Sequence, residues 1–309
     1  MVFGKIDDGE TLVDKKWSRI IFLLLLGIFL VTLTLIICIP IKFHLDARNV
    51  INEFNEILDD GEISYSQTIK EINFQPIIDT WAGSTNGDKS VVIYDLELNK
   101  LVGSYNISEK YNTASLYKLF VVYEGYRRLQ NGEWNKNTLA GSTGYTILEC
   151  LDKSIRESYS PCAETLWAMI GHTELDEIMR NNFKITDSDI SALISTPNDI
   201  LKIMKLFYDH SEIEDAEYLA VIKDSFLNQP TTEYNWRQGL PSGFSEKVKV
   251  YNKVGWDYNE NGYWNVYHDA AMVEFAEENR HFIVVVMTSR VPFQKIRALG
   301  TEIENSFNQ

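Results

Sequence analysis

A hydroxyl and an amine stand three positions apart in the stretch TASLYKLFVVY, as Ser115 and Lys118. Apolar residues recur through the stretch at helical spacing, which predicts a helix from Ser115 to Leu129. Residues three apart share one face of a helix, so the two side chains could touch and act as a nucleophile and its base. A surface serine and a solvated lysine are the alternative, because Ser-x-x-Lys should occur by chance on the order of once in such a chain.

Two more short motifs that could carry chemistry follow in chain order. Ser158-Tyr159-Ser160 comes after a second predicted helix, Thr146 to Ile155, and Lys253-Val254-Gly255 lies on a predicted strand. By itself, the first serine could be a helix cap and the lysine a charge at a strand edge. The occurrence of all three motifs in order, each on its own element, weighs against those separate explanations.

Together the three motifs resemble the signature of the serine β-lactamases and penicillin-binding D,D-peptidases, especially the class A-like branch. That signature consists of Ser-x-x-Lys, then Ser-x-Asn, then Lys-Thr-Gly. The resemblance covers residues 66–309 and includes the order of the elements. It implies acyl transfer from an amide or β-lactam carbonyl to a serine, followed by hydrolysis. A peptidoglycan stem peptide or a β-lactam would be the substrate.

The resemblance also implies a role for each reacting residue. Ser115 would be the nucleophile, and Lys118 would hold or take its proton. Lys118 must be neutral for this task, so burial or a nearby cation such as Lys253 must lower its pKa. Ser158 would relay a proton to the leaving nitrogen, with Lys253 beside it. The backbone N–H groups of Ser115 and Trp256 would bind the oxyanion that develops.

The chain departs from the family among the residues that would bind substrate, which are Ser160, Val254, Gly255 and Trp256. Ser160 stands where the family usually has asparagine, and it lacks the NH2 donors of a carboxamide. Val254 stands where threonine is usual and lacks the hydroxyl, a loss of about 1–3 kcal/mol if that bond is made. Both changes predict altered or weakened specificity before they predict inactivity.

A further departure concerns deacylation. In class A β-lactamases a glutamate on the loop before a Thr-Pro helix start activates the deacylating water. No glutamate occurs between Met179 and Thr196 in this sequence. Asp187 and Asp189 are the carboxylates of that segment, and a solvated turn is the role predicted for both. The sequence therefore favours a D,D-peptidase or a penicillin target over an efficient β-lactamase.

A non-catalytic function stays open as the alternative. Ser160 and Val254 would also suit a membrane-tethered module that keeps the fold and binds cell-wall peptide, or a protein, without turnover. The presence of all four reacting residues favours a hydrolase, because a pure binder has little need for them.

Other function classes lack their sequence signals. The chain has 44 Asp+Glu against 29 Lys+Arg and a net charge of −15, which would repel nucleic acid. It has no Gly-x-Ser-x-Gly elbow, and its five histidines show no metal-binding spacing. We expect no metal, no cofactor and no nucleic-acid partner, and a structural role for His268. The aromatic cluster Trp256, Tyr258, Tyr263 and Trp264 could line the substrate groove or shield a sheet edge.

One apolar segment is long enough to cross a membrane. Residues 20–41 read IIFLLLLGIFLVTLTLIICIPI, without a charge. At roughly 1.5 Å per residue, a helix of this length spans about 33 Å, close to the hydrocarbon thickness of a bilayer. Four lysines and arginines precede the segment, and two, Lys42 and Arg48, follow it within about 20 residues, so the positive-inside rule predicts a cytoplasmic N-terminus. The predicted organisation is a cytoplasmic tail (1–19), an uncleaved single-pass anchor (20–41), a stalk (42–61) and an extracytoplasmic catalytic domain (62–309).

Two cysteines, Cys150 and Cys162, flank Ser158. In an exported domain they could form a disulfide, worth about 2–4 kcal/mol, that fixes the segment presenting Ser158. Two small buried thiols are the alternative.

The order of the predicted elements indicates an α+β fold. A helix over 66–81 and two strands within 89–105 come first, and a helical block follows them. The chain then closes with strands over 247–255, 266–275 and 281–289 and a helix over 293–307. This order predicts a five-stranded antiparallel sheet built from both chain ends, flanked by helices, with an inserted all-helical subdomain. The catalytic cleft would lie between the sheet and that subdomain.

Overall fold

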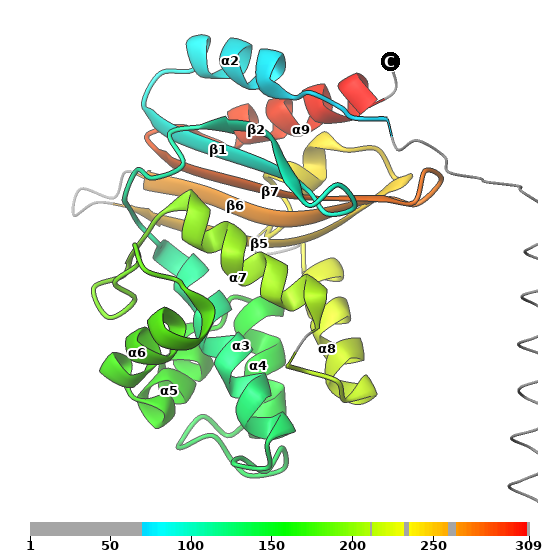
Figure 1. The fold of residues 1–309 in the computed structure, drawn as a ribbon. Coiled ribbons are helices and arrows are strands. Elements are labelled where there is room, and N and C mark those ends of the chain that lie inside the picture. The colour runs from blue at the N-terminus through cyan, green and yellow to red at the C-terminus, as the bar shows by residue number, and fades with distance from the viewer. Residues whose placement is uncertain (1–69, 211, 232–234, 259–263, 308–309) are drawn as a thin grey trace, which may run out of the picture. The chain divides into compact units, whose positions relative to one another are not determined.

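A five-stranded antiparallel sheet forms the centre of the structure (Figure 1), a computed structural model that describes residues 70–210, 212–231, 235–258 and 264–307. The strands lie in the order β2-β1-β7-β6-β5. Their bounds are β1 Asp88–Asp95, β2 Lys100–Tyr105, β5 Val248–Tyr258, β6 Trp264–Phe275 and β7 Arg280–Ser289. Because β1 pairs with β7, the sheet joins the two ends of the domain, as predicted.

The described residues belong to one unit, Ile69–Gln309. The predicted cytoplasmic tail, membrane anchor and stalk lie outside the described residues. Within the part of the chain that the structure describes, no helix is both long enough and apolar enough to cross a bilayer.

Both faces of the sheet are buried, because successive strand residues point to opposite sides and are apolar on each. On β7, Ile283 belongs to one apolar cluster and its neighbour Val284 to the other. Helices α2 (Gln75–Gly83) and α9 (Phe293–Phe307) cover the face of Val284 (Figure 1).

The other face carries the helical subdomain (Figure 1). Its helices are η1 Ala114–Leu116, α3 Tyr117–Gln130, α4 Ile147–Arg156, α5 Ser160–Ile170, α6 His172–Phe183, α7 Pro197–Asp209 and α8 Ala216–Leu227. A small second sheet pairs β3 (Tyr111–Asn112) with β4 (Ile194–Ser195), and η2 (Leu240–Gly243) precedes β5. The α+β architecture with an inserted helical subdomain is therefore confirmed.

Local sequence signals set several of the helix starts. Thr146 and Glu149 form a capping box at the start of α4, in which each side chain accepts the other residue's backbone N–H. At the start of α7 the Thr196 side chain accepts the N–H of Asp199, and Pro197 fills the first turn. The start of α4 agrees within a residue with the helix predicted from Thr146 to Ile155.

The first predicted helix is too long. Residues 66–69 lie outside the described residues, and residues 70–74 are not helical. The N–H of Phe74 donates instead to the carbonyl oxygen of Val102 on β2, at 2.8 Å. Helix α2 begins at Gln75 because Pro76 suits a first turn but cannot continue an earlier helix.

Candidate active site

Ser115 lies half-buried in η1, the short helical turn between β3 and α3. The preceding residue, Ala114, has a φ of +43°, a left-handed conformation that alanine adopts only under constraint. The constraint comes from two hydrogen bonds. The N–H of Ala114 donates to Oδ1 of Asn112 at 2.8 Å, and the N–H of Thr113 donates to the carbonyl oxygen of Leu193 at 2.7 Å. The hydroxyl is thus presented from a firmly held turn.

His268 on β6 anchors the same turn. Its Nδ1 lies 3.0 Å from the backbone nitrogen of Thr288, and its Nε2 lies 2.7 Å from the carbonyl oxygen of Asn112. Because the N–H of Thr288 can only donate, Nδ1 is the acceptor. Nε2 therefore carries the hydrogen and donates a hydrogen bond to the carbonyl oxygen of Asn112. Burial lowers the pKa of His268 to about 4, so the ring is neutral. These contacts are structural, in keeping with the role expected for this histidine.

Lys118 is fully buried on the first turn of α3, and oxygens surround its amine. Its Nζ lies 3.2 Å from Oγ of Ser115 and 3.0 Å from Oγ of Ser160. It also lies 2.5 Å from the carbonyl oxygen of Ser158 and 3.3 Å from the hydroxyl of that residue. A neutral amine has two N–H groups and one lone pair, so it can donate to two of these oxygens and still accept the proton of Ser115.

Lys253 reaches the same place from β5. Its side chain is 1% exposed, and its Nζ lies 2.8 Å from Oγ of Ser158 and 2.7 Å from the carbonyl oxygen of Val254. The Ser158 hydroxyl therefore connects the amines of Lys118 and Lys253. The structure brings together all four residues to which the sequence analysis gave reacting roles.

Both amines have lowered pKa values. Burial lowers the pKa of Lys118 to about 7, and the negative charge of Glu164 opposes this shift. Burial also lowers the pKa of Lys253 well below its usual value, and the positive charge of Lys118 adds to the effect while Asp269 opposes it. The site thus supplies the neutral amine that a serine nucleophile needs.

The turn that presents Ser158 is held on both sides. Ser158 has a φ of +52°, which turns its backbone sharply between α4 and α5. In the structure a disulfide joins Cys150 on α4 to Cys162 on α5, with Cα atoms 4.9 Å apart. The two helices that flank Ser158 are therefore linked covalently a short distance from it.

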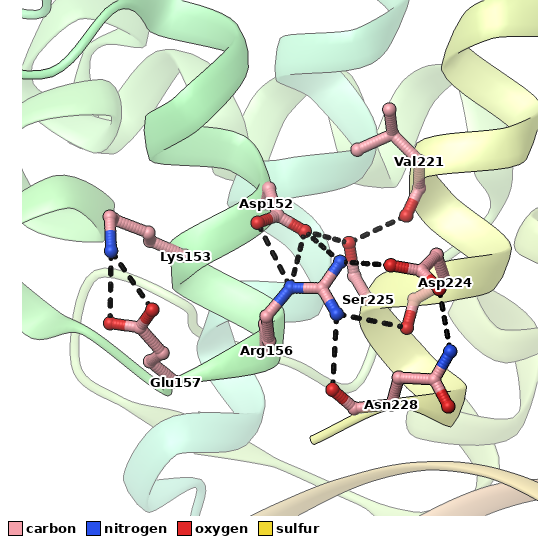
Figure 2. A network of polar contacts seen from close by, with 8 residues as sticks. All are labelled: Asp152, Lys153, Arg156, Glu157, Val221, Asp224, Ser225 and Asn228. Atoms are coloured by element: carbon pink, nitrogen blue, oxygen red, sulfur yellow. Dashed lines mark hydrogen bonds and ion pairs between the residues drawn. The ribbon is translucent and has the colours of Figure 1, made fainter. Parts of the chain in front are cut away.

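A polar network ties the end of α4 to α8, as Figure 2 shows. The guanidinium of Arg156 lies 2.8 Å from Oδ1 of Asp152 and 2.5 Å from Oδ2 of Asp224. It also donates to the carbonyl oxygen of Asn228 at 3.0 Å, while the hydroxyl of Ser225 donates to Asp152 at 2.6 Å. Since Arg156 is two residues before Ser158, the network restrains the start of the Ser158 turn.

The four residues predicted to bind substrate fall into two groups. Ser160 is exposed beside Lys118, and Gly255 lies directly against the turn of Ser115. A Cβ added at Gly255 would lie 2.9 Å from the carbonyl oxygen of Thr113, so only glycine permits this close approach. These two positions belong to the candidate site.

Val254 and Trp256 point the other way. Val254 is 1% exposed and packs in the apolar cluster beneath α2 and α9, on the sheet face opposite to Lys253. The ring of Trp256 stacks on Trp236 with centroids 4.6 Å apart and packs edge-on against Phe293 at 5.7 Å. For Trp256, these contacts favour shielding of the sheet over lining of the cleft. Tyr263, which was named with it, lies outside the described residues.

The segment before α7 is held by carboxylates that serve its own turns. Asp189 is exposed and accepts the hydroxyl of Ser191 at 2.7 Å and the N–H of Ala192 at 3.0 Å. Asp187 is exposed, and its N–H donates to the buried carboxylate of Asp199 at 2.8 Å. Both placements agree with the solvated turn predicted for this segment.

Two further carboxylates lie in this region, of which Asp269 was expected, with His268, to be structural and Glu164 was not considered from the sequence. Asp269, fully buried on β6, accepts the N–H of Leu240 at 2.7 Å and Nδ2 of Asn252 at 2.9 Å. Burial raises the pKa of Asp269 to about 7, and the hydrogen bond from Asn252 opposes the shift. The sequence feature that points to Asp269 is a carboxylate within an apolar predicted strand. Glu164 on α5 is the second, signalled by its position one helical turn after Ser160.

A cavity of about 330 Å³ lies apart from these groups, between α7, α8 and the sheet. Its lining includes Met204, Phe226 and Tyr251 but none of the four reacting residues. In the described ranges no cluster of three or more His, Cys, Asp or Glu side chains could hold a metal ion. The described site offers the hydroxyl of Ser115 beside the amine of Lys118, and the hydroxyl of Ser158 between the amines of Lys118 and Lys253.

The comparisons with known proteins give the same family as the motifs. A family model described as the beta-lactamase enzyme family matches residues 73–307, which is most of the chain. The resemblance inferred from the three motifs is therefore confirmed. No curated protein matches the sequence significantly.

Solved structures match the fold at low sequence identity. An ancestral class A β-lactamase (GNCA) is 14% identical with a TM-score of 0.62, covering 76% of this chain and 100% of that one. A class A β-lactamase representative from Bacteroides cellulosilyticus is 14% identical with a TM-score of 0.62, covering 75% and 96%. A β-lactamase from Xanthomonas campestris is 13% identical with a TM-score of 0.65, covering 76% and 99%. At these identities the likeness establishes the fold alone.

Proposed function

Because the chain belongs to the beta-lactamase enzyme family, we propose that it is a serine hydrolase acylated at Ser115 by a β-lactam or an acyl-D-Ala-D-Ala type amide. One observation carries the proposal. The buried amine of Lys118, with a pKa lowered to about 7, lies 3.2 Å from Oγ of Ser115. That distance and that pKa are what a general base for a serine nucleophile requires.

Acylation follows from the connected side chains. Lys118 takes the proton of Ser115 as Oγ bonds to the carbonyl carbon, and negative charge develops on the carbonyl oxygen. The backbone N–H groups of Ser115 and Trp256 stabilise that charge. The proton then passes from Lys118 through the hydroxyl of Ser158, which also contacts Lys253, to the leaving nitrogen as the C–N bond breaks.

The segment before α7 bears on what happens to the acyl-enzyme. It has no glutamate, and Asp189 serves its own turn. We therefore propose a D,D-peptidase-like or weakly β-lactamase-like enzyme rather than an efficient β-lactamase.

Labelling of the full chain with a fluorescent penicillin tests this function. We expect a covalent adduct, seen by gel fluorescence and intact mass, on the wild type and not on Ser115→Ala. Ser242→Ala, an exposed serine away from the site, is the matched control and should label normally. Equal labelling of Ser115→Ala would contradict the assignment of the nucleophile.

A binding module without turnover is the second candidate, favoured by Ser160 in place of asparagine and by the buried Val254. Such a module would bind a stem peptide at equilibrium and form no adduct with any acyl donor. Saturable peptide binding to both the wild type and Ser115→Ala, without an adduct on either, would support it.

We further propose that residues 20–41 anchor the protein in the cell membrane, with the catalytic domain outside the cytoplasm. The support is the uncharged run in the sequence and a disulfide, which persists in oxidising compartments. Fractionation should place the chain with the membranes, and protease added to intact cells should digest the domain. A domain that is protected until the cells are lysed would contradict the orientation.

A further inference from the structure

Glu164 lies on the side of α5 that packs against the start of α3. Ser160, Glu164 and Trp167 are spaced i, i+4 and i+7, so they share one side of the helix. Oγ of Ser160 is 3.0 Å from Nζ of Lys118, and the ring of Trp167 packs on Tyr117 with centroids 5.0 Å apart. Since the residues on this side before and after Glu164 both reach the start of α3, Glu164 faces that segment as well.

Electrostatics agrees with this placement. Burial lowers the pKa of Lys118, and the negative charge of Glu164 opposes that shift. Burial raises the pKa of Tyr117, and the charge of Glu164 adds to it. A carboxylate that influences both residues lies near the junction of η1 and α3, where Ser115 stands. Glu164 is exposed, so water has access to it.

Glu164 has no structural task among the described residues, with none of which it forms a hydrogen bond or ion pair. Neighbouring glutamates differ in this respect. Glu157 pairs with Lys153 at 2.9 Å, and Glu174 pairs with Arg128 at 2.5 Å. The carboxylate of Glu164 is thus available to a molecule bound beside Ser115 and Lys118.

We propose that Glu164 is the general base that activates the deacylating water, an inference that rests on the proposed acylation of Ser115. Glu164 takes a proton from a water molecule as the water oxygen bonds to the ester carbonyl carbon. The tetrahedral intermediate then breaks its bond to Oγ of Ser115, which receives the proton from Glu164. A carboxylic acid leaves and the free serine is restored, with water as the only reactant consumed.

The test separates formation of the adduct from its decay. The full chain and its Glu164→Gln variant are acylated with a fluorescent penicillin at about pH 8, where Lys118 is mostly neutral. Excess unlabelled penicillin is then added, and the loss of label is followed by gel fluorescence. Glu177→Gln, which removes an exposed glutamate on α6, is the matched control, and Glu164→Asp keeps the carboxylate on a shorter stem.

We expect Glu164→Gln to form the adduct within about threefold of the wild-type rate and to lose it at least about 100-fold more slowly. Glu177→Gln should match the wild type, and Glu164→Asp should decay at an intermediate rate. An adduct that decays equally fast in the wild type and in Glu164→Gln would overturn this inference and leave the acylation of Ser115 standing. Absence of any adduct on the wild type would overturn both.

Discussion

The amines of Lys118 and Lys253 meet at the hydroxyl of Ser158, and both lysines are buried. Two positively charged amines that contact the same hydroxyl would repel each other, and burial disfavours the charged form of each amine. Burial therefore lowers the pKa of both amines, that of Lys118 to about 7, and the positive charge of Lys118 adds to the lowering at Lys253. The Ser158 hydroxyl can then donate to one amine and accept from the other, as the proposed relay requires.

The pH dependence of acylation follows from the Lys118 amine. Its pKa is about 7, and the base must be neutral to accept the Ser115 proton, so the rate should rise with pH. We expect the second-order rate of penicillin labelling to increase about tenfold between about pH 6 and about pH 8, then level off. Stopped labelling at a series of pH values measures it. A rate that falls across this interval would mean that the protonated amine is the active form.

The position of Val254 gives a second expectation at this scale. Threonine, the usual residue of the family, would place its hydroxyl in the apolar cluster opposite Lys253. We expect Val254→Thr to lower the free energy of unfolding by about 1–3 kcal/mol without faster penicillin labelling. Urea denaturation and the labelling rate measure the two effects, with Val250→Thr in the same cluster as control. Faster labelling of Val254→Thr alone would show that its hydroxyl reaches the substrate.

At the scale of elements, the site depends on a brace that runs from α4 through α8 to β5. Arg156 joins the end of α4 to the C-terminal carbonyls of α8 (Figure 2). Beyond α8, the amide of Gln229 donates to the carbonyl oxygen of Asn252, next to Lys253 on β5. The turn of Ser158 and the strand of Lys253 are thus held by one helix between them.

Removal of the guanidinium tests the brace. We expect Arg156→Met to lower the free energy of unfolding by about 1.5–3 kcal/mol, because it leaves Asp152 and the helix carbonyls without their charged donor. Labelling should slow as the Ser158 turn loosens. Arg290→Met is the control. The side chains of Arg290 and its partner Asp88 are 68% and 62% exposed, so the free energy of unfolding should fall by less than about 1 kcal/mol. Equal effects of the two substitutions, measured by urea denaturation, would argue against the brace.

At the scale of the whole molecule, the site lies at the junction of the sheet and the helical subdomain. Ser115, Ser158 and Ser160 come from the subdomain, whereas Lys253 and Gly255 come from the sheet. All the contacts of the site described above lie within the unit Ile69–Gln309. The candidate site therefore depends on this unit folding as a whole.

A chain of residues 62–309 should consequently retain the site. We expect it to unfold in one cooperative transition, because apolar clusters on both faces of one sheet connect its layers. Its penicillin-labelling rate should lie within about twofold of that of the full chain, because changes remote from a site usually have small effects. Circular dichroism on heating and gel labelling measure these properties. Loss of labelling in a folded 62–309 chain would show that the preceding residues contribute to the site.

Much of this architecture follows from local signals in the sequence. Apolar patterning indicated β5, β6 and β7 and the helix that Thr146 caps, because these signals act over a turn or a strand pair. Ser115 and Lys118 likewise contact each other because residues three apart share one side of a helix. The first helix was predicted too long because Phe74 forms a bond to β2, a distant segment that the pattern does not encode.

The sequence by itself thus determined the order of the elements, the family motifs and the local pair Ser115 and Lys118, to which the proposal gives the first step. Only the tertiary structure decided that Lys253 meets Ser158, that Val254 packs on the sheet face opposite Lys253 and that the charge of Glu164 acts on Lys118. It also decided the pKa of Lys118, since the burial that lowers it requires the segments of Ser115, Ser158 and Ser160 to close around one amine. Spacing along the chain decides which side chains touch within one helical turn. The burial of a side chain and the charges around it depend on distant segments, which only folding brings together.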